Sequence, residues 1–324
     1  MENKTYKDFW NSQASSPESA ISAVDGSQSE DVVQHTGRWS AEQVRAALDI
    51  GPDDRVLELG CGIGRIGREL APRCRSWTGV DISENMIAYA GQRMAELDNV
   101  TFHQLQRSSL EMLADDSIDK AYSIAVFCHM DKEDLYLYMQ ELNRVVRPGG
   151  AIFVETWNLA HPIGWKRWEY EVNHWNRSDQ KQRKDVARNQ FCTPDEFELY
   201  VRQAGFTPLA TYSDSPWVQV IAGHSLDEED VARQHRRLAE QASRQAGDAG
   251  LEELEDRHEV IGDVRGRGLL LGTTLAEQLE VWVDDMPASM EVASYRRAME
   301  LMQAQRYAEA TEILEPLAQS SQPS

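Results

Sequence analysis

A glycine-rich turn and an aspartate that follows it are the residues of this chain best suited to bind a cofactor. Glycines stand at Gly60, Gly62 and Gly64, between an apolar stretch and a helical pattern. Glycine lets the backbone take positive φ and approach a ligand closely, and the amino end of the next helix offers free N–H groups to an anionic group. Asp81 ends the next apolar stretch, where its carboxylate can accept both ribose hydroxyls of an adenosine.

The glycine turn by itself is ambiguous between two classes of cofactor site. Gly62, Gly64 and Gly67 also have the G-x-G-x-x-G spacing of NAD-binding folds. The segments around the turn must therefore decide between a dehydrogenase and another nucleotide-binding enzyme.

The elements that position these residues alternate between strand and helix patterns. Short apolar stretches predict strands at 56–59, 77–80, 100–103, 119–127 and 151–157, with helices between them at 65–70, 83–97 and 131–146. A helix after Thr193 leads to two more expected strands, 207–212 and 217–222. The pattern predicts an α/β fold, a Rossmann-like doubly wound sheet of seven strands that ends in an antiparallel hairpin. A dinucleotide-binding dehydrogenase domain would not normally end in such a hairpin.

Four segments in this order resemble the motifs of class I S-adenosylmethionine (SAM)-dependent methyltransferases. Residues 56–65, Val-Leu-Glu-Leu-Gly-Cys-Gly-Ile-Gly-Arg, resemble the first motif of that family, and 79–83 resemble its ribose-binding strand end. Residues 119–130 resemble the fourth strand and its exit, and 144–153 are similar to the Arg-x-Leu-x-Pro-Gly-Gly segment before the fifth strand. The order of the motifs favours a methyltransferase over a dehydrogenase.

The resemblance implies SAM as the cofactor and assigns its contacts by position. Gly60, Gly62 and Gly64 would bracket the methionine part, with Glu58 supporting their loop. Asp81 would hold the ribose, and Ile82 would pack on the adenine. Ser109 and Leu110 are expected at the adenine edge, although a serine stands where the family often has an acid. Arg38 is expected either on the SAM carboxylate or as an exposed residue at a helix entry.

The acceptor side of the expected site is rich in aromatic and histidine side chains. His129, at the exit of the fourth strand, is the candidate general base, with a structural role in the SAM loop as the alternative; His161 and Glu155 are weaker candidates. The stretch 158–191 follows the fifth strand, where this family commonly covers its acceptor. Trp157, His161, Trp165 and Trp168 are expected to bind substrate there, or Trp165 and Trp168 only pin the segment to the domain.

Composition narrows the expected partners. The net charge is −21, with 33 basic against 54 acidic residues, whereas an enzyme acting on nucleic acid usually presents a basic patch. A small-molecule acceptor is therefore expected, and no nucleic acid. The chain shows no membrane span, and its four dispersed cysteines suggest neither disulfides nor a metal site. A cytoplasmic location fits these features.

The sequence predicts three regions. Residues 1–37 form an N-terminal arm, either a flexible lead-in or a segment that folds over a ligand, and order is expected to begin with Ser40 as an N-cap. Residues 38–224 form the methyltransferase domain. Residues 225–324 form an acidic, mostly helical accessory region in which 256–272 resemble a fragment of class III aminotransferases and 295–316 resemble one tetratricopeptide hairpin. This region could bind a protein partner or form a homo-oligomer.

Two functions remain open at this point. The chain is either a methyltransferase acting on an oxygen or nitrogen of a small molecule, or a SAM-binding regulatory protein that acts through its C-terminal region. Both would use the glycine turn and Asp81, so the shape of the acceptor side has to separate them.

Overall fold

The computed structural model describes residues 5–26, 29–177 and 188–248. All of them belong to one compact unit, Met1–Leu269, and the second unit, Leu270–Ser324, lies outside the described residues. The stretches 256–272 and 295–316, with their expected resemblances, therefore also lie outside the described residues.

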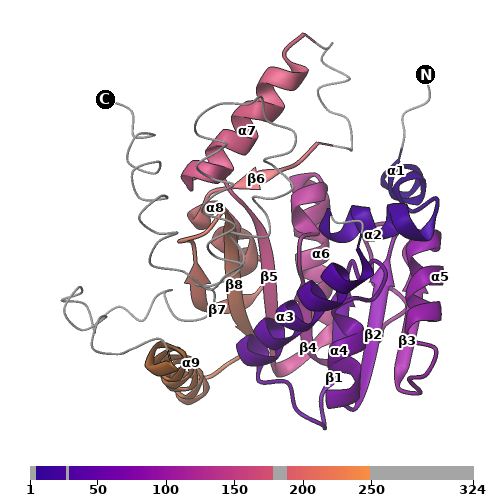
Figure 1. Cartoon of the computed structure of the whole chain (residues 1–324). Helices are drawn as coiled ribbons and strands as arrows, with labels where there is room; N and C mark the ends of the chain where they lie inside the picture. Colours follow the sequence, from indigo (N-terminus) through magenta and orange to yellow (C-terminus); the bar gives the residue numbers. More distant parts are fainter. Residues whose placement is uncertain (1–4, 27–28, 178–187, 249–324) are drawn as a thin grey trace, which may run out of the picture. The chain divides into compact units, whose positions relative to one another are not determined.

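One mixed sheet forms the centre of the described unit (Figure 1). Its strands run in the order β3-β2-β1-β4-β5-β8-β7, and the short β6 pairs with the end of β5. The strands are β1 (Arg55–Leu59), β2 (Ser76–Asp81), β3 (Val100–Gln104), β4 (Ile118–Ser123), β5 (Val146–Asn158), β6 (Phe191–Cys192), β7 (Phe206–Tyr212) and β8 (Trp217–His224). Strands β1 to β5 are parallel, and β8 pairs antiparallel with both β5 and β7. The predicted Rossmann-like sheet with its antiparallel hairpin is confirmed.

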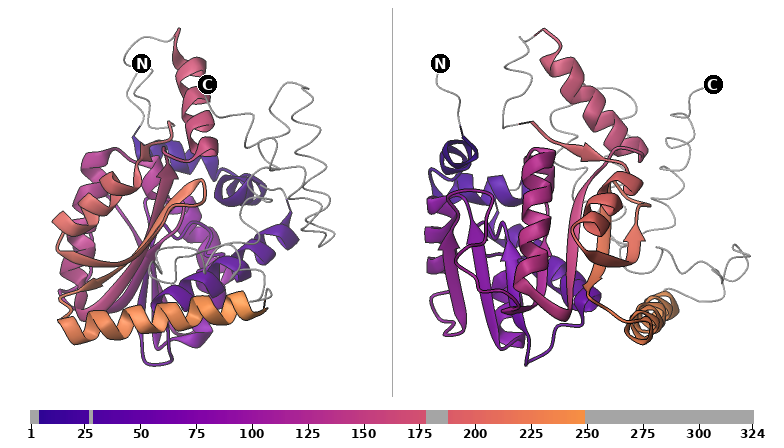
Figure 2. Two further views of the ribbon diagram at one scale, coloured as in Figure 1. Left: turned by 90° about the vertical axis from the view of Figure 1, so that its left-hand side faces the viewer. Right: turned by 180° about the vertical axis from the view of Figure 1, so that it is seen from behind.

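Helices cover both faces of the sheet, as crossover connections between parallel strands require. On the face toward the viewer in Figure 1 lie α3 (Glu30–Leu48) and α4 (Gly67–Leu70). On the opposite face, which is at the front in the right panel of Figure 2, lie α6 (Lys132–Val145) and α8 (Pro194–Gln203). The helix α5 (Glu84–Arg93) packs along β2 and β3.

Strands that are apolar on both sides explain why the sheet is buried. Val56, Leu57, Ile152 and Phe153 are each at most 1% exposed, and neighbouring residues of a strand point to opposite faces. Leu57 and Ile152 belong to a core cluster with side chains of α6 and α8. Continuous apolar runs of this kind are typical of parallel strands covered on both faces. The carboxyl ends of β1, β2 and β4 are thereby held side by side, and the turns that follow them converge on one edge.

Three helices lie above that edge in Figure 1. The N-terminal helices α1 (Tyr6–Gln13) and α2 (Pro17–Asp25) lie above the β1–β3 side, and α7 (Pro162–Trp175) lies above β5. Both N-terminal helices begin with side-chain caps, Thr5 for α1 and Ser16 for α2, in reciprocal capping boxes. The described part of the arm thus consists mainly of helix.

The prediction that order begins at Ser40 is wrong. The helix α3 begins after Ser29, and Ser40 is a buried residue inside it that accepts a hydrogen bond from Arg65 Nη1 at 3.1 Å. The stretch before Ser40 is helical because Val33 and Gly37 are buried; Gly37 lies so close to the Arg65 carbonyl that an added Cβ would approach it to 2.5 Å. Tertiary packing therefore overrides the weak helix propensity of glycine and valine.

The chain continues past the hairpin into α9 (Glu228–Asp248). Arg237 of this helix donates hydrogen bonds to the carbonyls of Ala46 and Ala47, at 2.9 and 2.7 Å, and so satisfies the carboxyl end of α3. Within the described ranges, no helix is long and apolar enough to cross a membrane.

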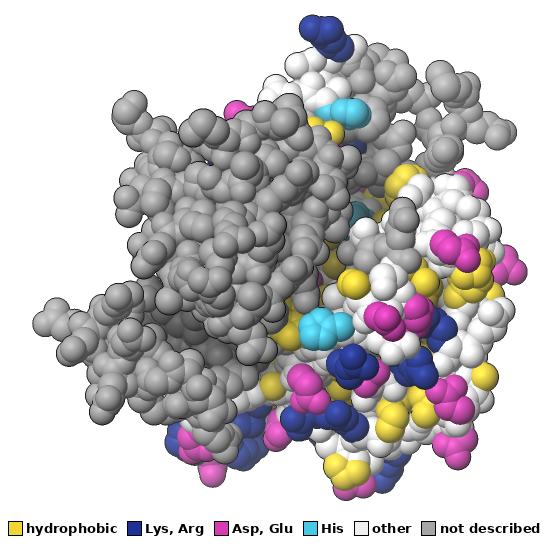
Figure 3. Space-filling view, in the orientation of Figure 1, with side chains coloured by type: hydrophobic (Ala, Val, Ile, Leu, Met, Phe, Trp, Pro, Cys, Tyr) yellow, Lys and Arg dark blue, Asp and Glu magenta, His cyan; other side chains and the backbone are white. Residues whose placement is uncertain are grey.

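The surface of the described unit carries charges of both signs. In Figure 3, Lys and Arg side chains lie among Asp and Glu side chains on the described part of that face. Glu42 of α3, for example, pairs with both Arg45 and Arg73, and Arg68 pairs with Glu96. Exposed pairs of this kind contribute little to stability.

Candidate active site

The glycine turn forms the floor of a cavity at the carboxyl edge of the sheet. Gly60, Gly62 and Gly64 have φ of 75°, 51° and 74°, values that side-chain-bearing residues rarely adopt. Gly60 and Gly62 line the cavity. A Cβ on Gly60 would approach Val126 to 2.3 Å. Glycine is therefore required here both for its conformation and for the close approach of the β4 exit loop.

Asp81 stands beside this turn with its carboxylate held by backbone groups. Gly62 N–H donates to Asp81 Oδ2 at 2.9 Å, and Ser83 N–H donates to Oδ1 at 2.8 Å. Burial raises the pKa of Asp81, while these N–H donors and that of Ile82 lower it. The carboxylate also lines the cavity, and it keeps acceptor capacity for a ribose hydroxyl.

A buried chain of hydrogen bonds lies beneath the turn. Trp77 Nε1 donates to the Tyr122 hydroxyl at 3.1 Å, and that hydroxyl donates to Glu58 Oε2 at 2.6 Å. Glu58 is 3% exposed, and burial raises its pKa to about 8 despite the Tyr122 bond and the nearby charge of Arg65. Glu58, two residues before Gly60, also lines the cavity, and its support of the cofactor loop stays a prediction.

The exit of β4 forms the wall opposite Asp81. Ile124, Ala125, Val126 and His129 line the cavity there, and a short 3₁₀ turn, Phe127–His129, carries the histidine. Burial lowers the pKa of His129 to about 4, and the charge of Arg167 adds to the shift. The imidazole is neutral at pH 7, so it can accept a proton, but only as a weak base.

The N-terminal helix α1 covers the cavity and is bound on both of its sides. The Trp10 ring contacts the His129 ring edge to face, with centroids 5.0 Å apart and planes at 71°. On the same helix, the Tyr6 hydroxyl accepts a hydrogen bond from Asp131 N–H at 2.8 Å. Asn11 Oδ1 accepts one from Ser83 Oγ at 2.8 Å. Helix α1 therefore links the start of α6 to the start of α5 across the opening.

Helix α2 contacts the glycine turn directly. Val24 lies against Gly62, where an added Cβ would approach Val24 Cγ1 to 2.9 Å, and Ala23 and Val24 both line the cavity. The sequence predicts an arm that could fold over a ligand, but it gives no position for Tyr6, Trp10 or Val24. The available signal was the aromatic cluster near the start of an otherwise polar stretch.

The loop after β3 places Ser108 rather than Ser109 at the cavity. Ser108 and Leu105 line it, whereas Ser109 and Leu110 are turned toward α6. Leu110 N–H donates to Glu141 Oε2 at 2.6 Å, and Ser109 Oγ donates to the same oxygen at 3.3 Å. The adenine roles of Ser109 and Leu110 stay predictions. Of the three neighbours, Ser108 is the one that lines the cavity.

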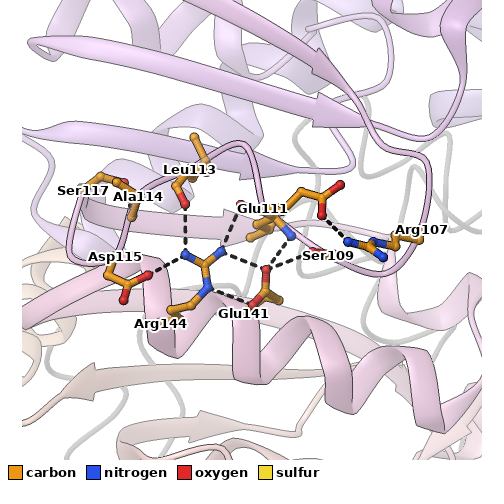
Figure 4. Close-up of polar contacts among 10 residues, drawn as sticks. Arg107, Ser109, Glu111, Leu113, Ala114, Asp115, Ser117, Glu141 and Arg144 are labelled. Carbon is orange, nitrogen blue, oxygen red and sulfur yellow. Dashed lines mark hydrogen bonds and ion pairs between the residues drawn. The ribbon is translucent and has the colours of Figure 1, made fainter.

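Arg144 fixes the same loop from the other side (Figure 4). Its guanidinium donates to both Glu141 oxygens at 2.9 Å, to Asp115 Oδ1 at 2.7 Å, and to the carbonyls of Leu110 and Leu113 at 3.0 and 2.9 Å. Arginine suits this place because its planar fork can donate in several directions at once. Arg144 thus holds the loop that follows β3.

Besides Ser109 and Leu110, two further predicted cofactor residues lie outside the cavity lining. Arg38 is exposed on the middle of α3, and Gly64 packs against Met94 and Ala90 of the α5 region. Arg65, which the sequence analysis did not select, lines the cavity instead. Arg65 precedes α4 and donates a hydrogen bond to Ser40, so it connects α3 to the glycine turn.

The predicted substrate residues at the end of β5 and in and before α7 lie apart from this cavity. Trp157 stacks on Trp217 with centroids 4.4 Å apart, and the rings of Trp165 and Trp168 lie 4.9 Å apart on α7. His161 caps α7, since its Nδ1 accepts the Ile163 N–H at 3.2 Å. Trp165 is 49% exposed. The four predicted substrate residues do not line the cavity that holds Asp81, and their acceptor role stays a prediction.

Part of the chain is similar to known methyltransferases. Residues 56–150 match the family model described as a methyltransferase domain. Over 128 residues the chain is 32% identical to "Methyltransferase GfsG" of Streptomyces halstedii, covering 38% of this chain and 45% of that protein. It is 32% identical over 120 residues to "Malonyl-[acyl-carrier protein] O-methyltransferase" of Marinomonas sp., covering 36% and 42%. The chain thus spans less than half the length of these two relatives.

A solved structure shares the fold. The magnesium protoporphyrin IX methyltransferase ChlM from Synechocystis PCC 6803, solved with bound SAH, superposes with a TM-score of 0.51 at 17% identity, covering 68% of this chain and 98% of that one. The chain therefore shares the Rossmann-like fold of this solved methyltransferase, and its residues 56–150 match a methyltransferase domain.

Proposed function

We propose that this chain transfers a methyl group from SAM to an oxygen or nitrogen atom of a small molecule bound beneath α1. One observation carries the proposal: a single cavity joins the glycine turn and Asp81 to a wall made by Trp10 and His129. A cofactor end and an enclosed acceptor end in the same cavity are what an in-line transfer requires.

The cofactor end fits SAM by the acceptor oxygens of Asp81 and by the glycines beside it. Asp81 can accept from a ribose hydroxyl, and Ile82 lies beside it to pack on a purine. Gly60 and Gly62 present backbone without a side chain to the cavity, where the methionine part would lie. SAM supplies a methyl group on a sulfonium, which is already activated for transfer. The chain therefore has to align the acceptor rather than activate the donor.

The acceptor end is apolar and aromatic, with one titratable imidazole facing it. Trp10, Val126 and Met130 supply apolar surface, which suits a small molecule with a ring or hydrocarbon portion. His129 can accept a proton from the nucleophilic atom, and its low pKa suits an acceptor that is already acidic or needs little help. The O-methyltransferase named among the relatives supports an oxygen acceptor.

The test is SAM binding followed by methyl transfer. Isothermal titration calorimetry should show binding of both SAM and S-adenosylhomocysteine. Transfer of labelled methyl from SAM should then be measured across phenols, amines, lipids and sugars, with acceptors scored by kcat/KM. Turnover of at least one small acceptor supports the proposal. Tight SAM binding without turnover on any acceptor would instead favour the regulatory protein acting through residues 225–324.

A further inference from the structure

The wall of the cavity at Ala125 is held in an uncommon backbone conformation. Ala125 has φ of 57°, in the left-handed region that residues with a Cβ rarely adopt. It lines the cavity between Ile124 and Val126, at the exit of β4. Such a conformation costs free energy and persists only where neighbouring groups enforce it.

The neighbouring group is the buried carboxylate of Glu155. Ala125 N–H donates to Glu155 Oε1 at 3.0 Å, and Gln219 Nε2 donates to Oε2 at 2.7 Å. Glu155 of β5 and Gln219 of β8 are paired residues of the antiparallel ladder, and each is 5% exposed. The central strands of the sheet therefore anchor the carboxylate on one side, and the carboxylate anchors the loop on the other.

The loop that Glu155 anchors, Ala125–Val126, contacts the glycine turn. Val126 follows Ala125. Its Cγ2 is so close to Gly60 that a Cβ added to Gly60 would approach it to 2.3 Å. A shift of Ala125 would move Val126 against or away from the turn that receives the methionine part of SAM. Glu155 does not line the cavity itself, so its effect on a ligand must pass through Ala125 and Val126.

We infer that Glu155 is a positioning residue that fixes the Ala125–Val126 wall against the glycine turn and thereby sets the affinity for SAM. The inference rests on the proposed cofactor site. It assigns a task to a carboxylate that the sequence considers only as a weaker candidate base. The ionised Glu155 carboxylate accepts the Ala125 N–H more strongly than a neutral group would.

The charge state of Glu155 makes this task dependent on pH. Burial raises the pKa of Glu155 to about 7, and the bonds from Gln219 and Ala125 and the charge of Arg65 oppose that shift. Among the described residues around it, Arg65 is the charged group that faces it, and Cys128 of the 3₁₀ turn is a buried thiol whose pKa is itself raised. Because ionised Glu155 holds the Ala125–Val126 wall more strongly, SAM binding favours the ionised form of Glu155. The affinity for SAM should therefore rise with pH through about 7.

Two variants separate positioning from mere packing. Glu155→Leu removes both acceptor oxygens and keeps a similar volume, while Glu155→Gln keeps an oxygen for Ala125 and has no charge to lose. Within the described residues Gln219 Oε1 is buried without a hydrogen-bond partner, so Gln219 can flip its amide and accept from Gln at position 155. Asp119→Asn is the control, because Asp119 is a buried carboxylate at the opposite end of β4 that bonds Arg55 and Arg147.

SAM affinity is measured by calorimetry at pH 6, 7 and 8 for the full chain and these variants. We expect Glu155→Leu to weaken SAM binding about three- to tenfold at pH 8, the range for one hydrogen bond. Glu155→Gln should recover most of that loss. The ratio of wild-type to Glu155→Gln affinity should fall toward one as pH drops to 6, and Asp119→Asn should bind as wild type does.

Two results would overturn the inference. Wild-type affinity in Glu155→Leu would show that the wall does not need the carboxylate, and a pH-independent ratio of wild type to Glu155→Gln would show that its charge is irrelevant. If Glu155→Leu fails to fold, the ratio with Glu155→Gln decides alone. Absence of SAM binding to wild type is a different result, which would refute the proposed function instead.

Discussion

The Trp10 ring lies edge to face against the His129 ring, with centroids 5.0 Å apart. This contact joins the N-terminal helix to the exit of β4 and closes the cavity above the cofactor turn. The side chains that a ligand meets there thus come from the first helix as well as from the methyltransferase motifs. The N-terminal arm is part of the candidate active site.

Replacing Trp10 tests this role of the arm. We expect Trp10→Ala to lower kcat/KM for the acceptor about three- to tenfold, because an aromatic pair contributes roughly 0.5–1.5 kcal/mol beyond its buried area. Trp10→Phe keeps a ring and should lose less. Steady-state kinetics with Trp165→Ala in parallel distinguish the two aromatic groups: a larger acceptor effect from Trp165 would place the acceptor under α7 instead.

Gly60 is the most constrained position of the cofactor turn. Gly60→Ala must place a Cβ at φ of 75° and 2.3 Å from Val126, so we expect a loss of roughly 1–3 kcal/mol in unfolding free energy and no measurable SAM binding. Gly91→Ala on α5 is the matched control. No atom lies within 4 Å of the added Cβ there, and a helical alanine should stabilise the chain by about 0.5–1 kcal/mol. Urea unfolding and calorimetry measure both, and intact SAM affinity in Gly60→Ala would contradict the account.

The hydrogen bonds of Arg144 offer a test of the loop after β3, which we expect to contact the adenine of SAM. Arg144→Met leaves Glu141 and two loop carbonyls without their donor, so we expect a loss of about 1–3 kcal/mol in stability together with a severalfold weaker SAM affinity. Arg75→Met is the control, because Arg75 pairs with the exposed Asp53 at 3.6 Å and such pairs contribute about 0–1 kcal/mol. Denaturant unfolding checks the stability; unchanged SAM affinity in Arg144→Met would show that the loop does not depend on this anchor.

Two buried glutamates should make the unliganded chain less stable at high pH. Burial raises the pKa of Glu58 to about 8 and that of Glu155 to about 7, from 4.5. The folded state then holds these protons more tightly than the unfolded state. Their contribution to stability is full below about 4.5 and is lost as pH rises through about 7 to 8.

Urea unfolding between pH 5 and 8.5 measures this dependence. The free energy of unfolding should fall with pH in the wild type and fall less in Glu58→Gln/Glu155→Gln, which has neither proton to lose. Asp119→Asn serves as the control, since two arginines hold the pKa of Asp119 far below this range. Equal slopes for the wild type and the double variant would contradict the buried state of these carboxylates.

The sequence predicts the parts of the site that depend on local pattern. Gly60, Gly62 and Asp81 lie together because each follows a strand of the parallel sheet, and the carboxyl ends of such strands meet at one edge. His129 reaches the cavity for the same reason. Strand and helix order with the closing hairpin followed from apolar runs and turn residues, so the fold was accessible without a structure.

The parts that depend on long-range packing could not be predicted. Nothing local places Trp10 on His129 or Tyr6 on Asp131, because these contacts depend on how α1 and α2 dock. Ser40 has the sequence of an N-cap, but buried Gly37 and Val33 extend the helix past it. Ser109 and Leu110 were expected at the adenine, yet Glu141 turns them toward α6 and leaves Ser108 at the cavity.

The central claim is that Asp81 holds the ribose of SAM in this cavity, and calorimetric titration of SAM into wild type and Asp81→Ala tests it most directly. Asp98→Ala, an exposed aspartate before β3, controls for the loss of a carboxylate. We predict that Asp81→Ala raises the Kd for SAM more than tenfold, about 1.4 kcal/mol, while Asp98→Ala leaves it unchanged. Equal affinity in wild type and Asp81→Ala would contradict the assignment of the site.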